Sequence, residues 1–306
     1  MTGGQTGPVF LGTAAFAVPI LEALAASRHR PSLVVTRIDS KAGRGLRESM
    51  TPVAEAAVAL GLPVVKTARP SGLDCIPEGC RLAVSAAFGL WLPESFIGRF
   101  VMGVLNVHPS LLPRLRGPCP IERAILGGDR RTGISFMLTD SGWDTGPVVS
   151  AFPTPIHPGE DSGMLSARLA GLAAREIEGV IDGYLSGRLE PVPQSGGATR
   201  AEKLTDEEAR LDWSRPADEL LRTIRAFAPS PGARTVFRGR LLKVLSAAES
   251  NRSIPPGTLS HSDGILLAGC GQGSIELLRL QPESRKAMEA RAFIAGYRPA
   301  PGEPLG

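Results

Sequence analysis

Asn106 and His108 lie two residues apart and are followed further along the chain by Asp144, and the types of these three side chains suggest chemistry. The apolar run before them, residues 101–105, is expected to form a strand. Side chains two apart on a strand share a face, so Asn106 and His108 should point the same way. Pro109 ends the pattern because it has no N–H to donate to a neighbouring strand.

An amide, an imidazole and a carboxylate are the groups that acyl transfer to a neutral amine requires. His108 can manage the proton of the attacking amine, Asn106 can donate its amide to the developing oxyanion, and Asp144 can orient the imidazole. Gly142 and Gly146 flank Asp144 and predict a flexible loop that lets the carboxylate approach the ring. Another interpretation stays open for each: a buried histidine bonded to backbone, a strand-end asparagine that satisfies turn amides, and a solvated turn aspartate.

The elements around these residues alternate between short apolar runs and helical stretches from residue 9 to about residue 188. This pattern predicts a parallel sheet with crossover helices. The expected strands are residues 9–11, 32–36, 62–66, 82–87, 101–105, 134–138 and 148–152, and the expected helices are residues 18–26, 52–60, 121–126 and 161–185. Active sites in such sheets lie at the carboxyl ends of the strands, where Asn106 is expected.

Several classes of protein are excluded by what the sequence lacks. There is no G-x-G-x-x-G and no G-x-x-x-x-G-K-[ST], so neither a nicotinamide cofactor nor nucleoside-triphosphatase activity is supported. The four cysteines are too scattered for a disulfide framework or a zinc site, and we expect no metal. No stretch approaches about 20 uncharged apolar residues and no signal-peptide pattern is present, so we expect a cytoplasmic protein without a membrane partner.

A length of 306 residues favours two domains. The Pro/Gly-rich passage 191–198 is typical of an interdomain linker. We therefore expect a catalytic domain over residues 1–188, a linker over 189–209 and a C-terminal domain over 210–306. Beyond the linker, a helix is expected at residues 216–226 and strands at residues 235–237, 241–245, 264–267 and 274–280, a pattern that fits a small β-barrel.

The formal net charge of +4 permits a nucleic-acid partner without requiring one. The distribution of the charge is more informative than the sum. From Arg225 to Lys243 the chain carries five cations and no acid, and Arg238, Arg240 and Lys243 flank Gly239, which predicts a basic hairpin. A solvated arginine-rich face explains the same charges equally well.

The residues around Asn106 and His108 also resemble a known family, the folate-dependent formyltransferases. The likeness rests on Asn106, His108, Ser110-Leu-Leu-Pro113, Arg114-Leu-Arg116-Gly117 and Asp144-Thr-Gly146. Further matching segments are Phe10-Leu-Gly12-Thr13, Phe16-Ala-Val-Pro19, Ala42-Gly-Arg44-Gly45, Asp212-Trp213-Ser214, Ile224-Arg225-Ala226-Phe227, Pro231-Gly232-Ala233 and Leu280-Gln281-Pro282. The resemblance runs nearly from end to end.

The resemblance implies an α/β fold: a Rossmann-like, mostly parallel sheet in the N-terminal domain and a smaller C-terminal OB-like β-barrel. It also implies 10-formyltetrahydrofolate as co-substrate, no metal, and Asn106, His108 and Asp144 as the catalytic residues. The expected folate-binding residues are Phe88, Leu90, Trp91, Leu92, Ser110, Leu111, Leu112 and Pro113. Trp91 can instead be an ordinary core residue, and Ser110 only a turn cap.

Within the family, the chain most resembles the members that formylate the α-amino group of initiator methionyl-tRNA. The resemblance implies that residues 42–45 enter the tRNA acceptor stem and that the barrel holds RNA. The expected tRNA-binding residues are Lys41, Arg44, Arg47, Arg234, Arg238, Arg240 and Lys243. We expect a monomer. Two alternatives are a formyltransferase for a small amine such as a nucleotide-linked amino sugar, and a non-catalytic RNA-binding relative, against which the retained Asn106, His108 and Asp144 argue.

The chain departs from the family pattern at several positions. None of them belongs to the Asn106, His108 and Asp144 group, so the transfer chemistry is expected to be unaffected. Several border the expected amine-acceptor side, which makes the acceptor less secure than the reaction type. The departures are Ala14-Ala15, Leu46-Arg47, Pro118-Cys119, Glu122, Asp140-Ser141-Gly142-Trp143 and Ser230.

Overall fold

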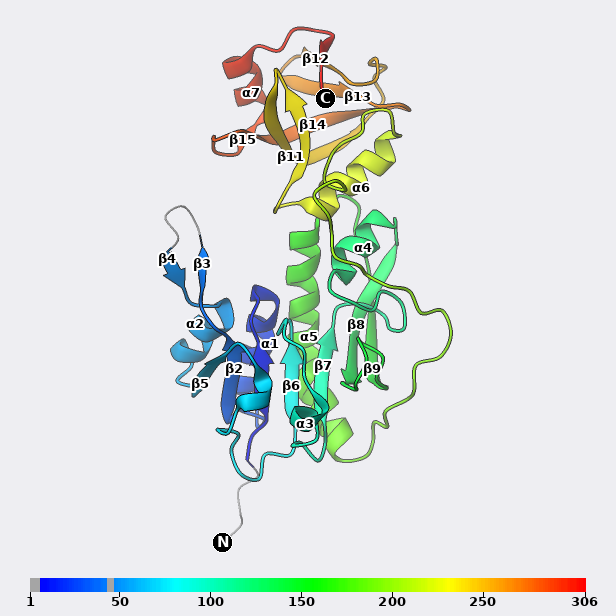
Figure 1. The fold of residues 1–306 in the computed structure, drawn as a ribbon. Coiled ribbons are helices and arrows are strands. Elements are labelled where there is room, and N and C mark those ends of the chain that lie inside the picture. Colours follow the sequence, from blue (N-terminus) through cyan, green and yellow to red (C-terminus); the bar gives the residue numbers. More distant parts are fainter. Residues whose placement is uncertain (1–5, 43–46) are drawn as a thin grey trace. The chain divides into compact units, whose positions relative to one another are not determined.

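The structure is a computed structural model that describes residues 6–42 and 47–306 (Figure 1). It divides into two compact units, each of which is described by itself. The first unit comprises Met1–Gly117, Thr132–Thr154 and Ser166–Arg200, and the second comprises Pro118–Arg131, Pro155–Leu165 and Ala201–Gly306. The domain boundaries expected at residues 188 and 209 remain a prediction.

The first unit is built on a seven-stranded sheet with the order β5-β2-β1-β6-β7-β8-β9. Its strands are β1 (Val9–Gly12), β2 (Leu33–Arg37), β5 (Val64–Thr67), β6 (Ala83–Ala86), β7 (Val104–His108), β8 (Arg131–Leu138) and β9 (Val148–Pro155). The five neighbouring strands β5, β2, β1, β6 and β7 pair in parallel, whereas β8 is antiparallel to β7. The expected Rossmann-like, mostly parallel sheet is confirmed, and its strand order reverses between β1 and β6.

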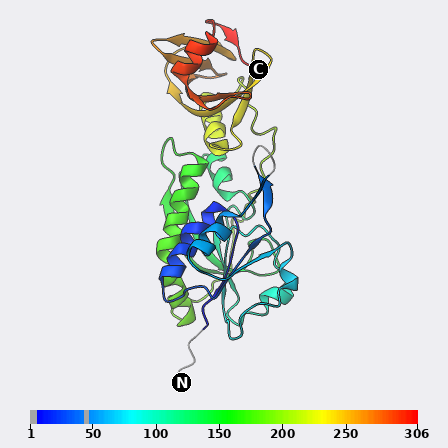
Figure 2. The ribbon, with the colours of Figure 1, turned by 90° about the vertical axis from the view of Figure 1, so that its left-hand side faces the viewer.

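The helices of this part of the chain are α1 (Val18–Ala26), α2 (Pro52–Ala59), α3 (Glu94–Ile97) and α5 (Ser162–Leu185), with the 3₁₀ turns η1 (Ala15–Ala17) and η2 (Pro70–Gly72). Figure 2 shows α1 and α5 on one side of the sheet and α3 on the other. The start of α2 illustrates the local code: Thr51 accepts a hydrogen bond from the Ala54 amide, and Pro52 supplies a preset φ at the first helical position.

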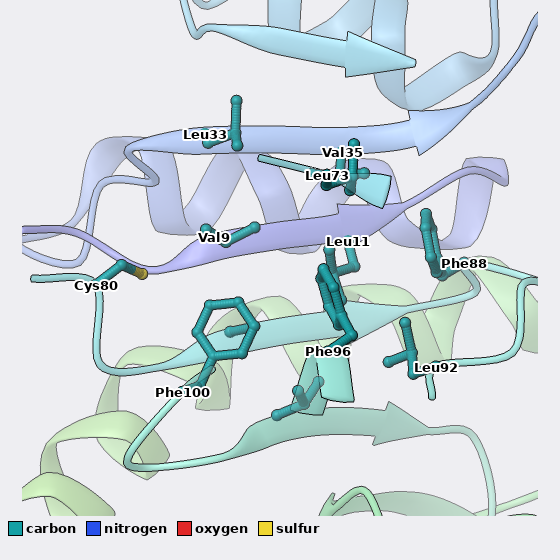
Figure 3. Close-up of a cluster of buried hydrophobic side chains, with 12 residues drawn as sticks. Val9, Leu11, Leu33, Val35, Leu73, Cys80, Phe88, Leu92, Phe96 and Phe100 are labelled. Atoms are coloured by element: carbon teal, nitrogen blue, oxygen red, sulfur yellow. The ribbon is translucent and has the colours of Figure 1, made fainter. Parts of the chain in front are cut away.

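One face of the sheet is covered by a cluster of buried apolar side chains (Figure 3). Val9 and Leu11 on β1 and Val35 on β2 contribute to it, since alternate residues of a strand share a face. Phe96 on α3 and Phe100 just beyond it pack edge-to-face against each other in the same cluster, with ring centroids 5.5 Å apart. Burial of two aromatic side chains stabilises the position of α3 against the sheet, by about 2 kcal/mol or more for each ring.

The strand expected at residues 101–105 lies instead at Val104–His108. Gly103 adopts a φ of +74° and donates its N–H to the Phe100 carbonyl, so the chain turns there, and Val101 is exposed. An apolar run therefore continued across a turn. Asn106 and His108 lie in the last part of the strand, where the shared face expected for them places both side chains.

Two short strands that the sequence pattern does not predict, β3 (Ser40–Ala42) and β4 (Arg47–Ser49), pair antiparallel with each other. Lys41 is opposite Glu48 in this register, and Ala42 is opposite Arg47. Polar residues dominate both segments, so no apolar alternation marked them as strands.

The second unit contains a curled antiparallel sheet of seven strands with the order β10-β11-β14-β13-β12-β16, and β15 pairs with β14. Its strands are β10 (Ala233–Phe237), β11 (Arg240–Ser250), β12 (Thr258–Ser262), β13 (Ile265–Gly269), β14 (Ser274–Pro282), β15 (Met288–Glu289) and β16 (Glu303–Pro304), and its helices are α4 (Pro120–Leu126), α6 (Ala217–Phe227) and α7 (Ala290–Tyr297). This half-barrel confirms the expected OB-like domain. The sequence analysis missed β12, which has a single large apolar residue, and the short helix α7.

The basic hairpin expected around Gly239 is formed by β10 and β11. Phe237 is opposite Arg240, so Arg238 and Gly239 make a two-residue turn, and both have positive φ, +50° and +71°. Such turns match the right-handed twist of the two strands that they join.

We predict that an ion pair of the second unit contributes to stability in a pH-dependent way. Arg123 Nη1 lies 2.5 Å from Glu208 Oε1, and Nη2 lies 3.1 Å from Oε2. The hydrogen bond from Arg123 lowers the pKa of the Glu208 carboxyl below its ordinary value. A carboxyl with a lowered folded-state pKa stabilises the fold above its ordinary pKa and loses that contribution as the pH falls through the folded-state value.

Glu208→Gln should therefore lower the Tm at pH 7, and its difference from the wild type should shrink below about pH 4. The exposed neighbour Glu207 provides a matched control, because Glu207→Gln should leave the Tm unchanged at every pH. Thermal unfolding followed by circular dichroism measures both. A Tm difference for Glu208→Gln that is the same at all pH values contradicts the assignment.

Candidate active site

Strand β7 carries Asn106 and His108 at its carboxyl end, and it is separated by β6 from the point where the strand order reverses. Asn106 is opposite Ser85 on β6 and Met137 on β8, and its side chain is partly exposed. Its amide makes no hydrogen bond to any residue that the structure describes, so both N–H groups are available to a ligand. Val107, between Asn106 and His108 in the strand, is buried, as the two-residue alternation predicts.

His108 is only 4% exposed, and each of its ring nitrogens faces an oxygen atom. Nε2 lies 2.9 Å from the Leu115 carbonyl oxygen. A carbonyl can only accept, so Nε2 carries the hydrogen in this arrangement. Nδ1 lies 3.6 Å from Asp144 Oδ2, which leaves its lone pair available in the neutral ring and places a carboxylate near the charge of the protonated ring.

The Leu115 carbonyl is presented by the loop of residues 109–117, which is tied down from two sides. Ser135 on β8 donates its hydroxyl to the Ser110 carbonyl at 2.8 Å and accepts from the Leu112 amide at 3.0 Å. Thr199 accepts the Leu115 amide on its hydroxyl at 2.9 Å. Leu115 has a φ of +58°, an uncommon conformation for leucine that these bonds hold.

Asp144 is held by its own loop and by the loop of residues 109–117. Its Oδ2 accepts the Gly117 N–H at 2.9 Å, and its φ is +53°. The Asp140 carboxylate accepts the Gly142 N–H at 3.0 Å and the Thr145 hydroxyl at 2.7 Å, which closes the turn before and after Trp143. The segment expected to be a flexible loop is therefore extensively hydrogen-bonded.

Gly146 has a specific steric reason in this loop. A Cβ atom there would lie 1.8 Å from the Leu138 carbonyl oxygen, so any other residue would force β8 and the Asp144 loop apart. The glycine permits the close approach of two backbones rather than flexibility.

Gln194 and Arg116 also contact the loop of Asp144, although neither is among the expected catalytic or binding residues; Arg116 appears in the sequence only as part of the matching motif. Gln194 donates from Nε2 to the carbonyl oxygens of Asp144 at 2.9 Å and Gly146 at 2.7 Å, and its Oε1 accepts Arg116 Nε at 3.0 Å and Nη2 at 2.8 Å. Gln194 lies in the segment that was expected to be a linker, where the Pro/Gly-rich composition indicated irregular backbone but not its partners. Contact between segments so far apart in sequence leaves no local signal.

Trp91 and Trp143 form an exposed aromatic pair in the first unit. Their ring centroids are 4.9 Å apart at an interplanar angle of 55°, and the two residues are 45% and 63% exposed. Trp91 is therefore not a core residue. Trp143 directly precedes Asp144 and was noted only as a departure from the family pattern, although large exposed aromatic side chains in contact are typical of a binding surface.

The remaining expected folate-binding residues fall into two groups. Phe88 and Leu92 are buried in the apolar cluster of Figure 3, so only their backbone can face a ligand, and Leu90 packs against the same cluster. The Phe88 carbonyl accepts the Thr13 hydroxyl at 2.8 Å, which ties this segment to the loop after β1. Ser110 is buried and donates its hydroxyl to the Arg114 carbonyl at 2.7 Å; partly exposed neighbours are Leu111, Leu112 and Pro113.

The expected tRNA-binding cations of the second unit differ in what already engages them. Arg234 pairs with Asp206, and Arg238 pairs with Glu303. Lys243 donates to the Pro231 carbonyl, an uncharged partner, at 2.6 Å. Arg240 is exposed and pairs with no acid in the described part of the chain.

The pair between Arg238 and Glu303 lowers the pKa of that glutamate and raises the pKa of Arg238. The guanidinium of Arg238 also lies over the Phe237 ring, 4.8 Å from its centroid. Of the cations expected near residue 44, Arg44 lies outside the described residues, and for Lys41 and Arg47 only the backbone is described.

Across residues 6–42 and 47–306, no group of His, Cys, Asp and Glu side chains is arranged to hold a metal ion. The four cysteines are free, and burial raises the pKa of Cys270 to about 11. No described helix combines the length and the apolar character needed to cross a membrane.

The sequence matches two family models along most of its length. Residues 8–181 match the formyl transferase model, and residues 203–298 match the formyl transferase C-terminal domain. Among curated relatives, a methionyl-tRNA formyltransferase from Myxococcus xanthus is 42% identical over 96% of both chains. Another, from Streptomyces griseus, is 40% identical over 97% of this chain and 99% of its own length.

Solved structures show the same fold at much lower identity. An N-formyltransferase from Helicobacter canadensis, solved with folinic acid and dTDP-3-aminofucose, superposes with a TM-score of 0.67 over 90% of this chain and 99% of its own, at 16% identity. A likeness at that identity supports the fold alone. Together with the matches in sequence, it leads to one conclusion: the chain belongs to the formyl transferase family, whose methionyl-tRNA formyltransferases it resembles over nearly its whole length.

Proposed function

We propose that this chain transfers the formyl group of 10-formyltetrahydrofolate to the α-amino group of initiator methionyl-tRNA. The observation that carries the proposal is the buried His108 with Nδ1 facing Asp144, next to the unengaged amide of Asn106, in a chain about 40% identical to curated methionyl-tRNA formyltransferases from end to end. The reaction takes place in the cytoplasm and the enzyme acts as a monomer with catalytic, linker and tRNA-binding segments at residues 1–188, 189–209 and 210–306.

In the proposed mechanism the amine nitrogen attacks the formyl carbon and a tetrahedral intermediate forms. The Asn106 amide donates a hydrogen bond to the oxygen that becomes negative. His108 accepts the amine proton on Nδ1, because Nε2 already carries the hydrogen that the Leu115 carbonyl accepts. Asp144 stabilises the resulting imidazolium. The carbon–N10 bond then breaks, N10 takes up a proton, and tetrahydrofolate leaves.

The co-substrate binds along the segment from Phe88 to Leu92 and the loop of residues 110–113. Pterin is flat and edged with amide-like donors and acceptors, which backbone groups in an apolar cleft match well. Trp91 and Trp143 add an exposed aromatic surface beside Asp144 that suits an aromatic part of the same ligand. The proposal therefore extends the expected folate-binding set by Trp143.

Our first prediction concerns turnover. His108→Ala and Asn106→Ala should each lower kcat about 100- to 1,000-fold while the fold and the affinity for tetrahydrofolate are retained. The double variant should lose much less than the product of the two effects, because the groups act on one transition state. Single-turnover formyl transfer to initiator methionyl-tRNA measures all three proteins.

The same assay should include a nucleotide-linked amino sugar as the competing acceptor. We expect the enzyme to formylate initiator methionyl-tRNA and not the sugar amine. Formylation of the sugar alone overturns the proposed acceptor, and near-wild-type kcat in His108→Ala overturns the proposed role of that residue.

A second prediction uses the tryptophan pair. The chain has three tryptophans, so in Trp91→Ile/Trp143→Leu only Trp213 remains, and it is buried in the second unit with its Nε1 bonded to Thr235. Removal of an aromatic contact surface should weaken binding of tetrahydrofolate about tenfold, and the quenching of tryptophan fluorescence on binding should largely disappear. Calorimetry of the single and double variants gives the affinities. Unchanged affinity in both single variants would place the folate elsewhere.

The third prediction separates cations by their partners. The logarithm of the affinity for tRNA falls linearly with the logarithm of the salt concentration. Arg240→Ala should make this slope shallower by about one, because an unpaired arginine is free to neutralise a phosphate. Arg238→Ala should lower it less, since Glu303 already offsets that charge. Arg252, an exposed arginine outside the β10–β11 hairpin, is the control and should leave the slope unchanged. Equal slopes in Arg240→Ala and wild type would remove this hairpin from the RNA-binding surface.

A further inference from the structure

The segment of residues 192–199 follows α5 and was expected only to connect two domains, yet it reaches both sides of the site. Val192 and Val148 exchange two backbone hydrogen bonds of 2.8 Å, so the segment runs beside the start of β9. Two residues further on, Gln194 uses its whole amide: Nε2 donates twice and Oε1 accepts twice. A glutamine with every donor and both lone pairs engaged has one orientation only.

The partners of Gln194 belong to the two loops that meet at Asp144. Its donors hold the carbonyl oxygens of Asp144 itself and of Gly146, and so fix the backbone that carries the carboxylate. Its acceptor holds Arg116, the neighbour of Gly117, whose N–H is bonded to Asp144 Oδ2. Gln194 therefore links Asp144 to Arg116, the residue next to the Gly117 N–H that the Asp144 carboxylate accepts.

The backbone of Asp144 needs such support. Its φ of +53° is uncommon for a residue with a Cβ atom, and such conformations persist only where the surroundings hold them. The two hydrogen bonds from Gln194 Nε2 hold the backbone here, one at the Asp144 carbonyl and one at the Gly146 carbonyl.

Thr199, at the other end of the segment, acts in the same way on the partner of His108. Its hydroxyl accepts the Leu115 N–H at 2.9 Å, its carbonyl accepts the Arg116 N–H at 2.9 Å, and its own N–H donates to Pro113 at 3.3 Å. These bonds fix the loop from which the Leu115 carbonyl accepts His108 Nε2.

We propose that Gln194 and Thr199 are positioning residues for formyl transfer: Gln194 holds Asp144 against His108, and Thr199 holds the carbonyl that sets the ring of His108. The inference rests on the proposed function for its kinetic readout. Neither residue touches the reacting atoms in this account. Both act through Asp144 or His108, so their loss should appear in kcat rather than in substrate affinity.

The experiment compares two substitutions of Gln194 with a neighbouring control. Gln194→Met keeps the length and removes all four bonds, whereas Gln194→Glu keeps the acceptor for Arg116 and replaces the donors to Asp144 and Gly146 by a carboxylate oxygen that repels their carbonyls. Both should lower kcat about 10- to 100-fold, since small misplacements of catalytic groups have effects of that size, with KM for either substrate within about twofold of wild type. Ser195→Ala, at an exposed position beside Gln194, should match wild type.

A double-mutant cycle distinguishes positioning from general support of the fold. If Gln194 acts through Asp144, Gln194→Glu should change kcat less than about twofold in an Asp144→Asn background. The same fold-loss in both backgrounds, or a loss confined to KM, overturns the proposal. Thr199 offers its own matched pair: Thr199→Ser keeps the hydroxyl and should retain activity, and Thr199→Val removes it and should lower kcat.

A readout that does not depend on activity is the hydrogen exchange of the Gly117 amide, whose acceptor is Asp144 Oδ2. Gln194→Glu should speed that exchange, while the core strand amides of β1 keep their protection. Unchanged exchange at Gly117 overturns the proposal. The two failures are distinguishable: a wild-type enzyme that formylates no charged tRNA overturns the proposed function, whereas an active wild type with unaffected Gln194 variants overturns only the positioning role.

Discussion

The site depends on a buried imidazole whose two nitrogens must both be accounted for. His108 lies at the carboxyl end of β7, almost wholly removed from solvent, and a buried polar group without a partner is destabilising by about 1–3 kcal/mol. The loop that follows the strand turns back and supplies the Leu115 carbonyl, and the loop after β8 brings Asp144 to the other side of the ring. Hydrogen bonds between Thr199 and Leu115 and between Gln194 and Asp144 hold the backbone that carries these two oxygens.

That arrangement explains why the loops around the site are so heavily bonded. The carbonyl and the carboxylate both come from residues with positive φ, Leu115 and Asp144, which the chain does not favour by itself. Thr199 and Gln194 hold those two residues through hydrogen bonds from a segment that is distant in sequence, and Ser135 accepts the Leu112 amide in the loop that presents Leu115. The loop of Asp144 is accordingly held by several hydrogen bonds. Gly146 is required there for the close approach to the Leu138 carbonyl rather than for mobility.

Much of the fold follows from local pattern in the sequence. The buried parallel strand β1 is an apolar run that ends in a glycine. The expected bounds of α1 match those observed, because its apolar spacing and its proline at the second helical position mark the start clearly. The pattern failed where apolar character and strand structure separate, as at residues 101–103, which form a turn at Gly103. It also failed where strands are polar, as in β3, β4 and β12.

The site was predictable only in part for a related reason. Asn106, His108 and Asp144 were predicted from their chemistry and from the motif around them, and the structure brings His108 and Asp144 together. Gln194 was not, because its role comes from backbone carbonyls far away in sequence, which no side-chain pattern records. Charge shows the same limit: the run of cations from Arg234 to Lys243 is visible in the sequence, but the acids that engage Arg234 and Arg238 are not.

In the proposed mechanism His108 keeps its hydrogen on Nε2, toward Leu115, and leaves Nδ1 to accept the amine proton. Nitrogen-15 chemical shifts of the histidine rings in labelled enzyme test it directly, because protonated and unprotonated ring nitrogens resonate far apart. The chain has four histidines, and the signals missing from a His108→Gln variant assign the ring. We expect a protonated Nε2 and an unprotonated Nδ1 in the neutral ring of His108. A neutral ring with its hydrogen on Nδ1 would contradict it.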